Sequence, residues 1–203
     1  MQPTAMNRQE TRGFVAREKI CQATVRCLAE LGYAETTIQR VADKANVSKG
    51  ALQHHFPTKE DLMTATAERI LQNATFMPEV VRRNPNKTRD VAREIMNTWR
   101  KLVDTDEYRA LLEILVAIRT DEALQMRLSP ILKRWNKQRM DESIEMYAAL
   151  DGSDKRVAQL MTLNTCMMRG LVIQDQYNED PEENLRLMKI WVEILSPLLE
   201  PRA

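Results

Sequence analysis

A stretch of about one hundred residues without glycine most constrains how this chain can fold: none lies between Ala51 and Asp151. Glycine is the residue that tight turns most often need, so a protein built of many short strands does not fit this stretch. The strongest helix formers (Ala, Leu, Arg, Glu, Met, Lys and Gln) dominate it. Because apolar residues recur three and four positions apart along the chain, the sequence predicts an all-α fold of about nine helices.

Capping and turn residues indicate where these helices begin and end. Gly32 ends the first helix, since glycine readily adopts a positive φ. Thr36 and Gln39 have the spacing of a capping box for the second, Asn46 suits a left-handed turn, and Ser48 is a natural N-cap for the third. The expected helices cover about 14–31, 37–45, 49–55, a longer one opened by Thr58, one carrying 91–102, 106–119, a stripe over 124–135, 154–177 and 182–196.

Two features of the later helices leave alternatives or mark a boundary. The segment from Pro78 to Asn86 is rich in Pro and Asn and predicts a connection after the fourth helix. The helix near 106–119 is apolar over most of its circumference, so we expect it to be central and buried. The stripe around Pro130 predicts either one helix kinked there or two helices that meet there.

Composition narrows the class of protein. Hydrophobic residues make up 43% of the chain and charged residues 29%, which is typical of a soluble globular protein. No run of about eighteen apolar residues is present and the first residues are polar, so we expect no membrane span, no signal peptide and a cytoplasmic location. Cys21, Cys27 and Cys166 are odd in number and lack C-x-x-C spacing, which favours reduced thiols.

The charge is unevenly distributed, although the net charge is only +1. Residues 1–60 hold nine Lys/Arg and six Asp/Glu, a net +3, and the remainder carries −2. A basic head on a slightly acidic body is compatible with binding a polyanion through the head. The expected domains are therefore a basic head over 1–60 and a helical body over 61–203.

The segment from 36 to 56 predicts the helix-turn-helix. Its apolar residues are spaced to form one small core with the first helix, so the helix at 49–55 is free to lie in a DNA major groove. Gly50 and Ala51 are small and let its backbone approach the duplex. The expected hydrogen-bond donors around them are Lys49, Gln53, His54 and His55, and the expected phosphate-neutralising residues are Arg40 and Lys59.

The run T-T-I-Q-R-V-A-D-K-A-N-V-S-K-G-A-L-Q-H-H-F-P-T-K-E-D-L, from Thr36 to Leu62, resembles the tetracycline-repressor-like (TetR/AcrR) regulators. Its V-S-K-G-A-L-x-x-H-F-x-x-K portion is far more specific than a generic helix-turn-helix, and the resemblance covers roughly residues 14–63. It implies an all-helical homodimer. A three-helix DNA-binding domain would be joined by a fourth helix to a ligand-binding and dimerising bundle.

The resemblance also implies roles for single residues. Thr37 and Gln39 or Arg40 would touch the DNA backbone or a base, and Ser48, Lys49, Ala51 and His54 would face bases or phosphates. His55 and Lys59 match positions of phosphate contacts. Position 53 is usually tyrosine in the family, whereas Gln53 keeps a donor and loses the ring, so it either reads a base such as adenine or contacts only the backbone.

The last two helices carry more apolar surface than one core contact needs. Their apolar arcs cover about half the circumference, which predicts a dimer interface. Gly170 costs helix stability, and close approach of a partner helix would explain it. The alternative is a monomer whose own bundle covers both faces. The expected interface residues are Leu163, Met167, Gly170, Leu187, Trp191, Ile194 and Leu198.

The body is also expected to contain a ligand cavity enclosed by the fourth to eighth helices. Asn164 lies on the main apolar face of its helix, and a buried amide needs either an internal hydrogen bond or a ligand. The alternative is a filled core in which Asn164 bonds to the backbone. The expected lining residues are Trp99, Leu102, Leu112, Leu115, Arg119, Met126, Trp135, Asn164 and Met168.

No enzyme motif is present: the sequence lacks G-x-S-x-G, a P-loop, H-E-x-x-H and a Gly-rich dinucleotide turn, so we expect no catalytic residues and no cofactor. His54 and His55 are neighbours and do not face each other on a helix, so no metal is expected. The sequence therefore predicts a repressor that binds a palindromic operator as a homodimer and is released by a small hydrophobic or aromatic effector. A family member without an effector, or a helical ligand carrier or enzyme, are the alternatives.

Overall fold

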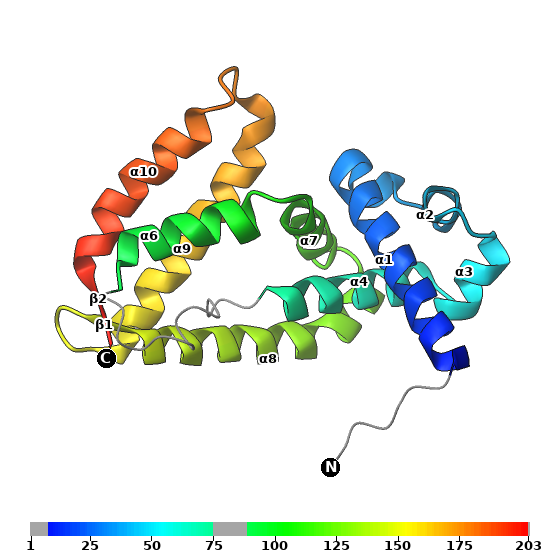
Figure 1. Cartoon of the computed structure of the whole chain (residues 1–203), viewed down its shortest axis with the longest axis horizontal. Helices are drawn as coiled ribbons and strands as arrows, with labels where there is room; N and C mark the ends of the chain where they lie inside the picture. The colour runs from blue at the N-terminus through cyan, green and yellow to red at the C-terminus, as the bar shows by residue number, and fades with distance from the viewer. Residues whose placement is uncertain (1–7, 75–88, 203) are drawn as a thin grey trace, which may run out of the picture. The chain divides into compact units, whose positions relative to one another are not determined.

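The computed structural model describes residues 8–74 and 89–202, and it is all-α apart from two short strands (Figure 1). These residues contain nine α-helices, as expected, while the predicted connection from Pro78 to Asn86 lies outside them. They form two compact units. Unit 1 takes the chain up to Gln72 together with Arg109–Ser129, and unit 2 takes Asn73–Tyr108 together with Pro130 onwards.

Unit 1 contains the helices that the motif predicted. They are α1 (Arg8–Glu35), α2 (Ile38–Ala45), α3 (Lys49–His55) and most of α4 (Lys59–Asn73), with most of α7 (Asp106–Ala117) and the start of α8 (Glu122–Met146). This division differs from the predicted boundary after residue 60, because α4 and residues 109–129 group with the first three helices.

One core joins the first four helices. Phe56, Leu52 and Leu62 are among its largest fully buried side chains. Burying a side chain of this size stabilises the fold by about 1.5–3 kcal/mol. The buried cluster consists of Ile20, Cys21, Ala23, Cys27, Val41, Ala42, Ala45, Leu52, Phe56 and Leu62.

The helix ends follow the predicted signals with one correction. Asn46 has φ 51° and ψ 54°, and Ser48 accepts a hydrogen bond from the backbone N of Ala51 at 3.1 Å, so the turn and the third cap are confirmed. The second cap is Thr37 instead of Thr36, since the Thr37 hydroxyl accepts from Arg40 N at 3.2 Å. Thr36 is buried and donates to a carbonyl of α1.

Unit 2 contains α6 (Val91–Thr98) and the one-turn π-helix Trp99–Val103, followed by the remainder of α8, α9 (Asp154–Gln174) and α10 (Glu183–Leu195). Short 3-10 turns, Asp175–Tyr177 and Ser196–Leu198, follow α9 and α10. Two strands that the sequence analysis did not expect, β1 (Tyr147–Ala149) and β2 (Leu199–Pro201), pair antiparallel with Ala148 opposite Glu200.

The structure also tests the expectations for the helix at Pro130 and for the helix near 106–119. The stripe around Pro130 belongs to one helix, since α8 runs through the proline. The expected burial of the 106–119 helix is only partly right, because Val116 is 59% exposed while Leu111 and Ile114 are buried. In the described part of the chain, no helix is both long and apolar enough to cross a membrane.

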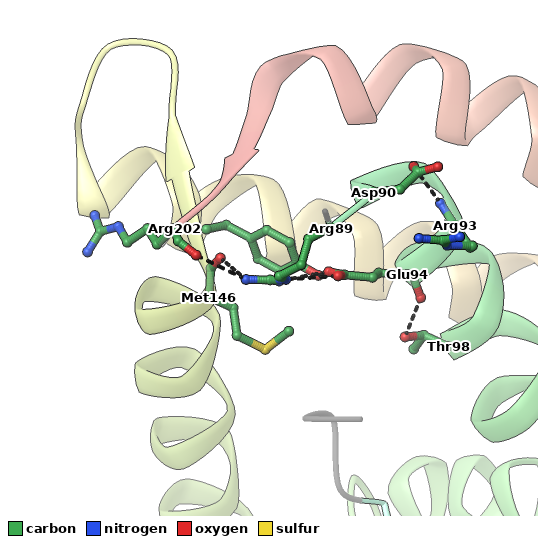
Figure 2. Close-up of polar contacts among 8 residues, drawn as sticks. Arg89, Asp90, Arg93, Glu94, Thr98, Met146 and Arg202 are labelled. Atoms are coloured by element: carbon green, nitrogen blue, oxygen red, sulfur yellow. Dashed lines mark hydrogen bonds and ion pairs between the residues drawn. The ribbon is translucent and has the colours of Figure 1, made fainter. Parts of the chain in front are cut away.

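A buried ion pair closes one end of unit 2, as Figure 2 shows. Arg89 and Glu94 form two parallel bonds, Nε to Oε1 at 2.9 Å and Nη2 to Oε2 at 2.8 Å, and both side chains are largely buried. Tyr147 donates to Glu94 Oε2 at 2.7 Å, and Arg89 Nη1 donates to the carbonyls of Met146 and Arg202. The start of α6 is thereby fastened to the end of α8 and to the C-terminal strand.

Candidate nucleic-acid interface

The short helix α3 presents one polar face to solvent. Leu52 and Phe56 bury its other side in the core, and Ser48 fixes its first turn. The residues predicted on the outer face are all exposed: Ser48, Lys49, Gly50, Ala51, Gln53 and His54. No atom of the structure comes within 4 Å of the position that a Gly50 side chain would occupy, so the helix surface is open there. This open, basic first turn has the form needed to enter a groove of a nucleic acid.

The predicted residues of α2 are exposed and already make local contacts. Arg40 Nη1 donates to Glu35 Oε2 at 2.6 Å and to the carbonyl of the same residue at 2.8 Å. Gln39 Nε2 donates to Asp43 Oδ1 at 2.8 Å, and Thr37 is the cap described above. An exposed ion pair contributes only about 0–1 kcal/mol, so a phosphate can take over Arg40 at small cost.

His55 is half-buried at the end of α3, and its neighbour on α1 is a residue that sequence reasoning missed. Arg17 Nη1 donates to the carbonyl of His55 at 3.0 Å, and its guanidinium lies 4.4 Å from the centroid of the Phe56 ring. Burial lowers the pKa of His55, helped by His54 and Arg17. Arg17 is 38 residues away in sequence, so only its charge could have drawn attention to it.

Lys59 is less available than predicted. Its Nζ donates to the carbonyl of Tyr33 at 2.8 Å and lies 4.1 Å from the centroid of the Tyr33 ring, and burial lowers the pKa of Lys59. The Tyr33 hydroxyl in turn donates to Asp121 at 2.8 Å. This ammonium therefore anchors α4 to the end of α1, and a phosphate would have to compete for it.

Comparison with known proteins bears on this face directly. Residues 20–66 match the family model for bacterial regulatory proteins of the tetR family. The chain is 26% identical to the transcriptional regulator CymR of Pseudomonas putida, over 92% of each chain, and 31% identical to the repressor AcnR of Corynebacterium glutamicum, over 64% of this chain and 63% of that one. Residues 20–66 therefore resemble the DNA-binding domain of tetR-family regulators.

One solved structure has a similar fold. It is a transcriptional regulator from Saccharomonospora viridis in complex with choline, which is 17% identical and superposes with a TM-score of 0.66. The match covers 94% of this chain and all of that one. The likeness therefore extends beyond the helix-turn-helix to the helices of the body.

The residues predicted to line a cavity divide between the two units. Trp135, Asn164 and Met168 line a cavity of about 30 Å³ in unit 2. Trp99 is buried and Leu102 half-buried in the π-helix of the same unit, outside the lining. The remaining four belong to unit 1: Leu112 is buried, Leu115 half-buried, and Arg119 and Met126 are exposed.

Two polar residues of this cavity differ in how well the sequence revealed them. Asn164 has an internal partner, since Trp191 Nε1 donates to its Oδ1 at 2.9 Å. This partner is a side chain, whereas the filled-core alternative expected a bond to the backbone. Arg139 was not predicted, yet it is only 5% exposed and lines the same cavity. Its spacing of four from Trp135, which places both on one face of α8, was the available signal.

The expected dimer residues occupy the outer sides of α9 and α10. Leu163 is 55% and Ile194 57% exposed, and Leu198 is exposed as well. Met167, Leu187 and Trp191 are half-buried. Apart from its chain neighbours and its own helix backbone, no atom of the described residues lies within 4 Å of the position that a Gly170 side chain would occupy, so no contact among these residues explains the glycine.

Proposed function

We propose that this protein is a TetR-family transcriptional regulator, and a repressor, that binds a palindromic operator as a homodimer. The observation that carries the proposal is the exposed polar face of α3, held by a capped turn and matched by the family model. The residues proposed to contact DNA are Thr37, Gln39, Arg40, Ser48, Lys49, Gly50, Ala51, Gln53, His54, His55 and Lys59. TetR-family chains are regulators, so we propose no catalysed reaction.

DNA binding is tested with the duplex upstream of the protein's own gene, or with duplexes selected from a random library. Fluorescence anisotropy should show sequence-specific binding that weakens steeply with salt, because lysine and arginine release counterions from phosphates. The variant with Lys49, Gln53 and His54 all changed to Ala should lose it. The control is Lys133→Ala with Gln125→Ala, two exposed residues of α8. Wild-type affinity in the triple variant would reject the assignment.

Dimerisation is supported by the apolar surface on α9 and α10. A symmetric interface uses the same patch on both copies, and large exposed patches of this kind mark association sites. The residues proposed to form it are Leu163, Met167, Gly170, Leu187, Trp191, Ile194 and Leu198. Light scattering should give twice the mass of one chain at micromolar concentration, and Ile194→Glu should shift it to one. A single-chain mass for the wild type would favour the monomer.

Release by a small hydrophobic or aromatic effector is supported by the cavity in unit 2. An effector can act only if it binds one conformation better than the other, here a conformation whose two recognition helices no longer fit successive grooves. The small volume of about 30 Å³ favours the second candidate, a regulator without an effector. A thermal-shift screen separates them, since a compound that raises the melting temperature and weakens operator binding establishes the effector.

A further inference from the structure

The cavity in unit 2 has an apolar wall that can rearrange. Trp135, Met161 and Met168 lie along it, and two of these are methionines, whose unbranched side chains adapt to different shapes. A volume of about 30 Å³ accommodates roughly one water molecule. A larger ligand therefore has to displace these side chains, which methionines allow more easily than branched residues.

The hydroxyl groups of the lining are mostly occupied. Five hydroxyl-bearing residues line the cavity, and four of them donate to protein oxygens. The four are Thr98 to Glu94 O at 3.0 Å, Ser143 to Arg139 O at 2.8 Å, Tyr147 to Glu94 Oε2 at 2.7 Å and Thr165 to Met161 O at 2.9 Å. Recognition of a polar ligand group therefore falls mainly to the other polar residues.

Asn164 offers hydrogen-bond donors to the cavity. The indole of Trp191 can only donate, so the amide oxygen of Asn164 must face it, and this fixes which way the amide points. The remaining part of the amide is its NH₂ group. Within the described residues, this group donates no hydrogen bond to another side chain or carbonyl, so it is left for a ligand acceptor.

Arg139 brings a positive charge to the same lining. Its Nη1 donates to Thr165 Oγ1 at 3.0 Å and its Nη2 to Asn136 Oδ1 at 3.2 Å, and the guanidinium lies 5.7 Å from the centroid of the Trp135 ring. Burial lowers the pKa of Arg139, and the nearby charge of Arg169 acts in the same direction. An anion bound in the cavity would favour the charged form of this buried guanidinium.

From these contacts we propose that the effector is an organic anion, a carboxylate joined to an apolar or aromatic body. Arg139 binds the carboxylate, the Asn164 amide donates to it, and the body lies against Trp135 and the methionines. Arginine suits this role because its planar fork matches a carboxylate. The inference rests on the proposed ligand-responsive function and specifies the chemistry of the ligand.

The lining also contains one carboxylate, which bears on the choice between anion and cation. Glu142 is half-buried and accepts a hydrogen bond from Gln138 at 3.0 Å. Arg139 is the more deeply buried of the two, so its charge is less screened by water and decides the preference.

The test uses matched probes of different charge with the full-length chain. Benzoate, phenylacetate and octanoate are compared with their neutral amides, and with benzylamine and choline as cations. Calorimetry should show the carboxylates binding on the order of tenfold or more tighter than the amides, and Arg139→Gln should abolish the difference. Arg134→Gln, an exposed arginine of the same helix, is the control for net charge. Glu142→Gln should strengthen carboxylate binding.

Several outcomes would overturn the inference. Equal binding of amides and carboxylates, tighter binding of the cations, or no binding of any carboxylate would each do so. The comparison among probes needs only the wild type, and Arg139→Lys replaces Arg139→Gln if the latter does not fold. Operator binding is measured on the same samples, so loss of DNA binding, which would reject the proposed function, is recorded separately from the preference for charge.

Discussion

The helix-turn-helix of unit 1 and the Arg89 site of unit 2 are held by opposite means. In the helix-turn-helix, the N-cap residues Thr37 and Ser48 each accept a hydrogen bond from a backbone N–H three residues further on. In unit 2, Arg89 and Tyr147 reach partners 57 and 53 residues away. Local bonds leave the outer face of α3 free for a partner, whereas long-range bonds consume the side chains that make them. The first kind of site is suited to present residues, and the second to fasten segments together.

Removing the acid at the centre of the long-range site should have the largest effect. Glu94→Ala leaves Arg89 buried without its carboxylate and Tyr147 without its acceptor. Breaking a buried pair in this way costs about 3–5 kcal/mol, measured as the free energy of unfolding in urea. The control, Asp180→Ala, removes one partner of the exposed Arg186 and should lower the free energy of unfolding far less, because exposed ion pairs contribute little. An equal loss of unfolding free energy in the two variants would contradict the larger contribution expected of the long-range site.

Removing a local N-cap hydrogen bond should lower the free energy of unfolding by a smaller amount. Ser48→Ala deletes the acceptor that caps α3 and should lower the free energy of unfolding by about 1 kcal/mol. Ser48→Gly is the matched variant, because glycine at an N-cap costs only a few tenths of a kcal/mol. If alanine and glycine behave alike in urea titrations, the cap contributes little to the stability of the turn.

Substitutions on the exposed polar face of α3 should change DNA binding instead of the free energy of unfolding. Lys49→Ala should weaken binding to all sequences by a similar factor and reduce the slope of log affinity against log salt by about one. Gln53→Ala should relax base preference at one or two operator positions, because its amide reads a base edge. Anisotropy titrations at several salt concentrations, with single-base operator variants, distinguish the two roles. Unchanged base preference in Gln53→Ala would assign this residue to the backbone.

The smallest effect should come from the histidine at the end of α3. Burial lowers the pKa of His55 in the folded protein, so the unfolded chain binds a proton more readily. The folded protein therefore loses stability as the pH falls through the pKa of histidine in the unfolded chain, near 6.5. Urea unfolding between pH 7.5 and 5.5 should show a steeper loss for the wild type than for His55→Gln. An identical pH dependence would contradict this.

The same contrast explains what could be predicted from the sequence. Asn46 and Ser48 were identified correctly because their roles depend on residues within three positions. The cap was placed one residue early at Thr36, since two threonines stand together and only the fold shows that the first is buried. The strands were missed because each has three residues and its partner lies about fifty positions away.

The cavity shows the limit of reasoning from one helix at a time. Periodicity identified Trp135, Asn164 and Met168, which lie on buried faces of α8 and α9. Arg139 belongs to a stretch crowded with charged residues, and its contact with Thr165 spans 26 positions. A single helical pattern cannot reveal which of several arginines is buried by another helix.

The hydrogen bond from Trp191 to Asn164 also gives the molecule an internal optical signal. Indole emission shifts with the polarity and bonding around its N–H, and this indole lies on α10 while its acceptor lines the cavity. The chain has three tryptophans, so changing Trp99 and Trp135 to Phe would leave one fluorophore. Its emission wavelength would then record, without any added dye, when the amide in the cavity changes partner.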